Sequence, residues 1–82
     1  MTMRIFRVGV LILALGLVST GLWALGAPNS WYATFPGLGH AWVAALGPYN
    51  EHLARDVGAA LLGFGVLLAW TAAAPRAPLA PA

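Results

Sequence analysis

The chain has 82 residues, of which 61% are hydrophobic and only 7% are charged, and its mean hydropathy is +0.82. Soluble domains are about 25% charged, so this composition excludes an ordinary soluble domain and favours a protein that has the bilayer as its solvent. The formal charge of +2 comes from four scattered arginines, which offer no basic face to nucleic acid, and the lack of cysteine excludes disulfides and thiolate chemistry.

The first predicted element is a transmembrane helix over residues 8–25. This run, VGVLILALGLVSTGLWAL, holds eighteen uncharged residues. At about 1.5 Å per residue it nearly crosses a hydrocarbon core of about 30 Å. Arg4 and Arg7 precede it, so residues 1–7 are predicted to form a cytoplasmic N-terminus.

The same segment also fits a signal peptide. The segment has a basic start and an apolar centre, as signal peptides do. The small residues Ala24 and Gly26 fit a cleavage site. Cleavage there would leave one span and an external N-terminus. The length of the apolar run and the bulky Trp23 near the cut favour an uncleaved span.

Residues 26–56 are predicted to form an external loop and the start of a second helix. Proline and glycine recur through this segment and exclude a long helix before the second span. Its aromatic residues are Trp31, Tyr32, Phe35, Trp42 and Tyr49. Such rings favour the membrane–water boundary, so we expect the loop to lie on the outer leaflet.

Within this loop, a short interfacial helix over residues 38–46 is expected to turn Trp42, Val43 and Leu46 toward lipid. The aromatic residues also fit a platform for a ligand or a partner protein. The two roles can coexist.

The second predicted transmembrane helix covers residues 57–74 and ends before Pro75. Arg76 follows it, so three arginines flank the terminal ends of the two spans and only Arg55 lies at the other end. The positive-inside rule therefore predicts that both termini are in the cytoplasm. Residues 75–82 alternate proline and alanine and are predicted to be a disordered cytoplasmic tail. The predicted fold is therefore all-α, a two-helix hairpin in the plasma membrane.

Small residues on both spans predict where the helices approach each other. The predicted packing positions are Gly16 and Thr20 on the first helix and Ala59 and Gly63 on the second. Small side chains allow close contact between membrane helices. Packing within one chain is the preferred interpretation, and association between copies is the alternative.

A polar cluster precedes the second span. Asn50 or Pro48 is a suitable helix start. Glu51 and Arg55 are four residues apart, as are His52 and Asp56, so all four side chains are predicted on one broad face. That face continues toward Ala59 and Gly63, which places the cluster on the predicted packing side.

Three roles fit this cluster. The first is a structural clasp between the loop and the helix, with the histidines as hydrogen-bond partners. The second is a metal site in which His40, His52 and Asp56 supply ligands, with Glu51 as a further candidate. The third is a proton relay or general acid–base pair formed by His52 and Asp56, or a polar ligand pocket at the membrane surface. No nucleotide-binding or hydrolase motif accompanies them.

The segment FPGLGHAWVAALGPYNEHLARDVG resembles part of a family of uncharacterised small membrane proteins of actinobacteria. The similarity covers about a third of the chain. It rests on FPG (Phe35, Pro36, Gly37), WV (Trp42, Val43), GPYNEH (Gly47 through His52) and RD (Arg55, Asp56). Those proteins tend to have further spans, so the resemblance implies a shortened version or a half-bundle that pairs with another copy. It implies a topology and a special loop, and no reaction.

The sequence thus predicts a non-enzymatic accessory or structural subunit, without a cofactor, that packs in the lipid bilayer against a larger membrane complex or against itself. Two short helices enclose no cavity on their own, so any site is expected to need walls from a partner. The alternative is a membrane protein that binds a small ligand or metal through the polar cluster.

Overall fold

The computed structural model of the chain describes residues 2–73, which form helices and loops without a strand. The elements are α1 (Thr2–Gly26), α2 (Pro28–Thr34), the short 3-10 helix η1 (Ala44–Leu46) and α3 (Glu51–Ala73). The predicted all-helical fold is confirmed for this part of the chain. The predicted tail and the last residue of the second predicted span lie outside the described residues.

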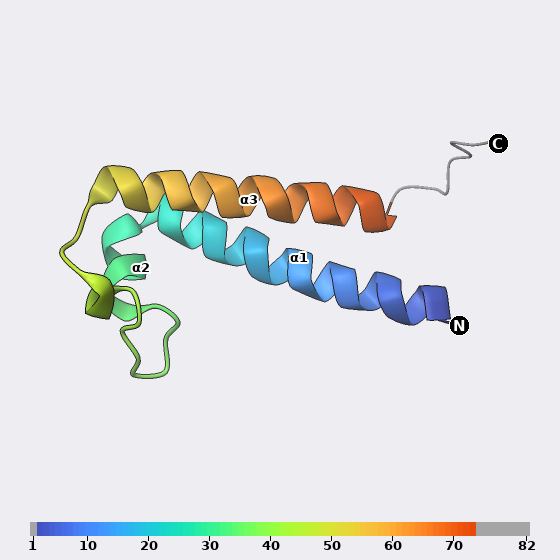
Figure 1. Ribbon diagram of the computed structural model, residues 1–82, viewed down its shortest axis with the longest axis horizontal. Helices are drawn as coiled ribbons and strands as arrows, with labels where there is room; N and C mark the ends of the chain where they lie inside the picture. Colours follow the sequence, from blue (N-terminus) through green and yellow to red (C-terminus); the bar gives the residue numbers. More distant parts are fainter. Residues whose placement is uncertain (1, 74–82) are drawn as a thin grey trace.

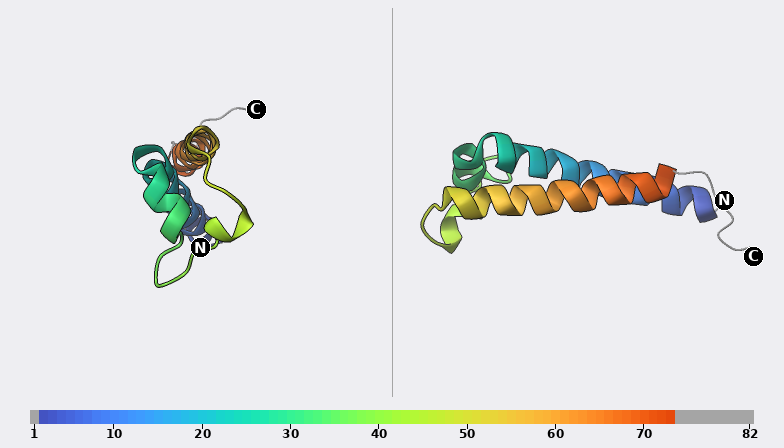
Figure 2. Two further views of the ribbon diagram at one scale, coloured as in Figure 1. Left: turned by 90° about the vertical axis from the view of Figure 1, so that its left-hand side faces the viewer. Right: turned by 90° about the horizontal axis from the view of Figure 1, so that it is seen from above.

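The two long helices lie side by side and run in opposite directions (Figures 1 and 2). The start of α1 and the end of α3 are at one end of the molecule, and α2 and η1 are at the other. α1 has 25 residues and α3 has 23. At about 1.5 Å per residue each exceeds a hydrocarbon core of about 30 Å. Both helices are long and apolar enough to cross a membrane.

The contact between α1 and α3 brings their backbones together. A Cβ atom added to Gly21 would lie 2.6 Å from the backbone nitrogen of Leu62 and 2.7 Å from the carbonyl oxygen of Gly58. One added to Gly65 would lie 2.9 Å from the backbone nitrogen of Val18. Since Cβ atoms essentially never approach backbone this closely, only glycine permits the observed separation of the helices.

The small residues at this contact repeat every seven residues on both helices, as Ala14 and Gly21 on α1 and as Gly58 and Gly65 on α3. Gly21 lies against Gly58, and one heptad further along the pair, Ala14 lies against Gly65. All four residues are buried. A seven-residue repeat keeps one seam of each helix facing its partner, as in coiled coils. The sequence therefore encodes a continuous seam of small residues.

The predicted packing residues lie beside this seam and not in it. Gly16, Ala59 and Gly63 are exposed, and Thr20 is half-buried. Cβ atoms added to Gly16 or Gly63 would meet nothing within 4 Å. The prediction was therefore wrong for the contact between the two helices. Larger apolar residues on the two helices are half-buried near the seam: Leu17, Val18, Leu61 and Leu62.

The loop end has a small core of its own. Ala24, Trp31 and Ala54 are buried together, so that α1, α2 and α3 meet there. The sequence did not predict α2, which carries Trp31 into this core. The expected interfacial helix over residues 38–46 is reduced to η1.

A tight turn precedes η1. Gly37 and Gly39 have φ values of 101° and 86°, in the left-handed region where glycine has no steric penalty. The backbone N–H of Trp42 donates to the carbonyl of Phe35 at 2.9 Å and closes this turn.

Candidate functional site

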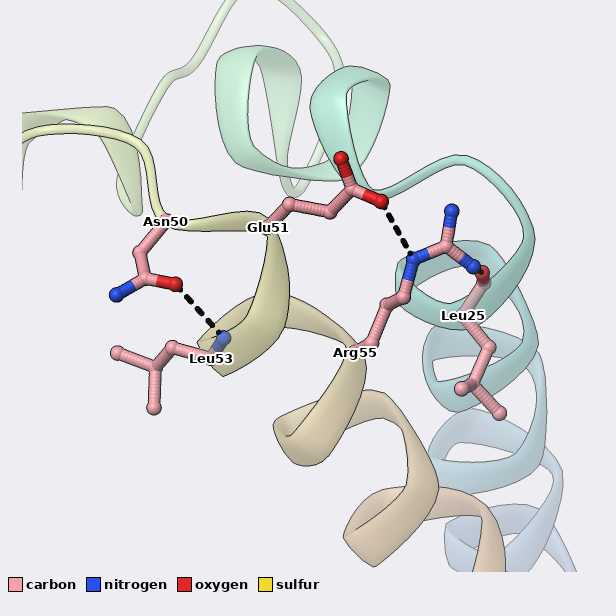
Figure 3. Close-up of polar contacts among 5 residues, drawn as sticks. All are labelled: Leu25, Asn50, Glu51, Leu53 and Arg55. Carbon is pink, nitrogen blue, oxygen red and sulfur yellow. Dashed lines mark hydrogen bonds and ion pairs between the residues drawn. The ribbon is translucent and has the colours of Figure 1, made fainter.

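α3 begins at Glu51, directly after Asn50, which is one of the two predicted helix starts. The carboxamide oxygen of Asn50 accepts a hydrogen bond from the backbone N–H of Leu53 at 3.0 Å (Figure 3). This is the ordinary N-cap arrangement, which satisfies one of the free donors of the first turn. Glu51 follows in that first turn, where a carboxylate opposes the positive end of the helix dipole.

Arg55 joins the two long helices at this end. Its Nε donates to Glu51 Oε2 at 3.0 Å, and its Nη1 donates to the carbonyl oxygen of Leu25 at 2.9 Å (Figure 3). Leu25 lies in the last turn of α1, whose carbonyls lack partners within the helix and carry partial negative charge. We call Leu25, Glu51 and Arg55 the Arg55 clasp. It supports the structural role considered for the cluster, with one difference: Arg55 connects helix to helix.

His52 and Asp56 form a second, separate pair. Their Nε2 and Oδ2 atoms are 3.3 Å apart, and their side chains are 89% and 64% exposed. The prediction that all four side chains share the packing face was therefore wrong. Ala54 and Gly58 are buried instead, and at about 100° per residue they turn His52 and Asp56 away from α1.

His40 lies apart from both pairs. It is exposed, in the turn that follows α2, and its ring centroid is 5.6 Å from that of Trp42. Among residues 2–73 there is no group of three or more histidine, cysteine, aspartate or glutamate residues placed to hold a metal ion. The ligand set proposed from His40, His52 and Asp56 is thus not brought together.

Several aromatic residues of the loop end pack against one another. The Phe35 ring lies 5.9 Å from both Trp23 and Trp31 between centroids, at angles typical of tilted aromatic pairs. The Tyr32 hydroxyl donates to the carbonyl of Gly47, and its ring packs beside Tyr49 at 5.1 Å. These contacts hold α2 against the segment that leads into α3.

Some apolar side chains of the loop remain exposed. Leu38, at the turn, is 97% exposed, and Trp42 and Leu46 are also exposed. Val43, expected beside them on the lipid side, is half-buried because it packs against the loop core. The loop therefore has one face that packs inward and one that is free.

The structure also contains a cavity that sequence reasoning missed. It has a volume of about 560 Å³ and lies between α2, the segment around η1 and the first turns of α3. It is a cleft that is partly open to the surface, and its walls come from α2 and the segment around η1 as well as from α3. The expectation that two helices enclose no cavity of their own concerned α1 and α3 alone, and it stays a prediction.

Comparisons with protein-family models, with curated proteins and with solved structures gave no match. The resemblance to the actinobacterial membrane proteins stays a prediction.

Proposed function

We propose that the protein is a small, non-enzymatic integral membrane protein of the plasma membrane, in which α1 and α3 both cross the bilayer. It acts as an accessory or structural subunit that packs against a larger membrane complex or against another copy of itself. Four observations support the proposal: the exterior of the helices, the distribution of charge, the free glycines and the use of the polar cluster.

The observation that carries it is the apolar exterior of α1 and α3. The buried hydrophobic residues of the described chain are four alanines and Trp31. The large apolar side chains remain outside, among them Ile5, Phe6, Ile12, Leu13, Leu15, Phe64, Leu67 and Trp70. In water, each square ångström of such surface costs about 25 cal/mol. Lipid or a partner helix removes that cost.

The distribution of charge supports the orientation. Arg4 and Arg7 are exposed near the start of α1, at the end of the molecule where α3 finishes. Arg55 lies at the opposite end, together with Glu51 and Asp56. The positive-inside rule then places the termini in the cytoplasm and the loop outside.

The partner is proposed from the glycines that the α1–α3 seam leaves free. Gly16 and Gly63 are exposed on the outside of the helix pair, and nothing lies within 4 Å of the position where each Cβ would be. Exposed small residues in an apolar helix allow another helix to approach closely. In this proposal the partner helix packs over one of these positions.

The use of the polar cluster favours this role over the alternative of a ligand or metal site. Arg55 is occupied by Glu51 and Leu25. His52 and Asp56 contribute two donor groups, whereas structural zinc sites have four ligands.

The test is native mass spectrometry of the protein extracted from its own membrane in mild detergent. We expect the chain in a stoichiometric complex that is lost in Gly16→Leu or in Gly63→Leu and kept in His52→Ala. Because nothing lies near the Gly63 Cβ position, that substitution leaves the α1–α3 seam intact. A free chain would contradict the subunit role, and extra mass lost in His52→Ala would favour the ligand or metal alternative.

A further inference from the structure

The cavity beside α3 has the dimensions and the lining of a ligand site. Its volume of about 560 Å³ falls within the range of about 300–1,000 Å³ that is usual for small-molecule sites. Trp31 and Tyr32 of α2 form one wall, Val43 and Leu46 a second, and Leu53 and Val57 of α3 a third. The wall is thus mostly apolar and aromatic. We propose that this cavity holds one acyl chain of a membrane phospholipid.

The lining changes from polar to apolar along α3. Among the lining residues on this side, Asn50 caps the helix, and Val57, the first residue of the uncharged run, lies farthest along it. Seven residues of helix separate them by about 10 Å. The Asn50 oxygen is occupied by the N–H of Leu53, and its NH₂ group points away from that turn as a donor (Figure 3). This order matches an amphiphile whose headgroup oxygens lie near Asn50 and whose chain runs toward Val57.

A hydrocarbon chain fits the wall better than a peptide does. A bound peptide needs partners for its own backbone N–H and carbonyl groups. Few are available, since the Tyr32 hydroxyl already donates to Gly47 and the Asn50 oxygen is taken. An acyl chain needs none.

The inference rests on the proposed membrane location, which makes acyl chains the most abundant apolar molecules around the protein. Leu53 is exposed, and Val57 leads into the part of α3 whose large apolar side chains face outward. One wall of the cavity is therefore continuous with the surface that lipid covers. A chain enters without crossing water.

The test is native mass spectrometry of purified protein in detergent, titrated with dioleoylphosphatidylcholine. We expect one lipid per chain to bind saturably. Val57→Trp and Val43→Trp fill the cavity from opposite walls, and each should weaken retention at least five-fold. Val66→Trp is the matched control, because Val66 is exposed on α3 and does not line the cavity.

Two variants keep the test decisive if one fails to fold, as judged by circular dichroism. Absence of a saturable 1:1 adduct, or equal retention by the folded cavity variants and Val66→Trp, would overturn the proposal. Membrane fractionation separates this failure from that of the proposed function: a protein that stays in the membrane but retains no lipid refutes only the acyl-chain site.

Discussion

Replacing Gly58 by alanine tests the seam between α1 and α3. The added Cβ would lie 2.8 Å from the backbone nitrogen of Leu25 and 2.9 Å from the carbonyl oxygen of Gly21. Both contacts are with backbone, so no side chain can rotate away and the helices must separate. Overpacking of this kind costs about 1–3 kcal/mol. Alanine recovers up to about 1 kcal/mol of that cost through its higher helix propensity.

Gly63→Ala is the matched control, because Gly63 lies on the same helix and nothing lies within 4 Å of its Cβ position. The propensity gain is common to both variants, so their difference in stability isolates the packing cost. We expect Gly58→Ala to be less stable than Gly63→Ala by about 1–3 kcal/mol. The measurement is a titration with sodium dodecyl sulfate in mixed micelles, followed by the fluorescence of the tryptophans, of which Trp31 is buried beside the contact. Equal stability of the two variants would refute the close backbone approach.

Three further substitutions separate the contacts of the loop end. Arg55→Gln removes the guanidinium donor to the Leu25 carbonyl and should lower the stability in mixed micelles by about 1 kcal/mol. This value is low for a charged donor because the side chain is half exposed. An unchanged midpoint of the detergent titration would contradict the clasp. Tyr32→Phe removes the donor to Gly47 and should speed amide hydrogen exchange in η1 several-fold while leaving exchange in the middle of α1 unchanged. His52→Ala removes only an exposed pair, so the stability measured by detergent titration should change by less than about 0.5 kcal/mol. A larger loss of stability would show a structural role for that pair.

The helices were predictable because their signals are local. Eighteen uncharged residues in a row specify each long helix, and Asn50 marks the start of α3 through its own side chain. The two side-chain pairs, Glu51 with Arg55 and His52 with Asp56, were equally predictable, because residues four apart on a helix are neighbours whatever the rest of the chain does. These features needed no knowledge of tertiary contacts.

The rotation of the helices about their axes was not predictable in the same way. The helix faces that carry Gly16 and Gly63 are as rich in small residues as the faces that carry Gly21 and Gly58. Composition therefore does not show which pair of faces forms the contact. A signal was present in the seven-residue spacing of Ala14 and Gly21, matched by that of Gly58 and Gly65. Recognising it required both helices to be read together, in antiparallel order.

The loop end depends on contacts between residues far apart in the chain. The second partner of Arg55 is a backbone carbonyl thirty residues away, and such an acceptor leaves no mark in the sequence. The same holds for the cavity, whose walls come from three elements, one of which is the unpredicted α2. Pro28 occupies the first turn of α2, where proline is common, but proline also breaks helices, so this residue alone does not predict a helix.

The most direct test of the central claim uses the absence of native cysteine. Met3→Cys and His52→Cys introduce single thiols at exposed positions at opposite ends of the helix pair. Right-side-out and inside-out membrane vesicles are then treated with a membrane-impermeant maleimide. Two spans with cytoplasmic termini predict labelling of His52→Cys only in right-side-out vesicles and of Met3→Cys only in inside-out vesicles. Labelling of both thiols from the same side, or loss of the residue 3 thiol by cleavage, would contradict the account.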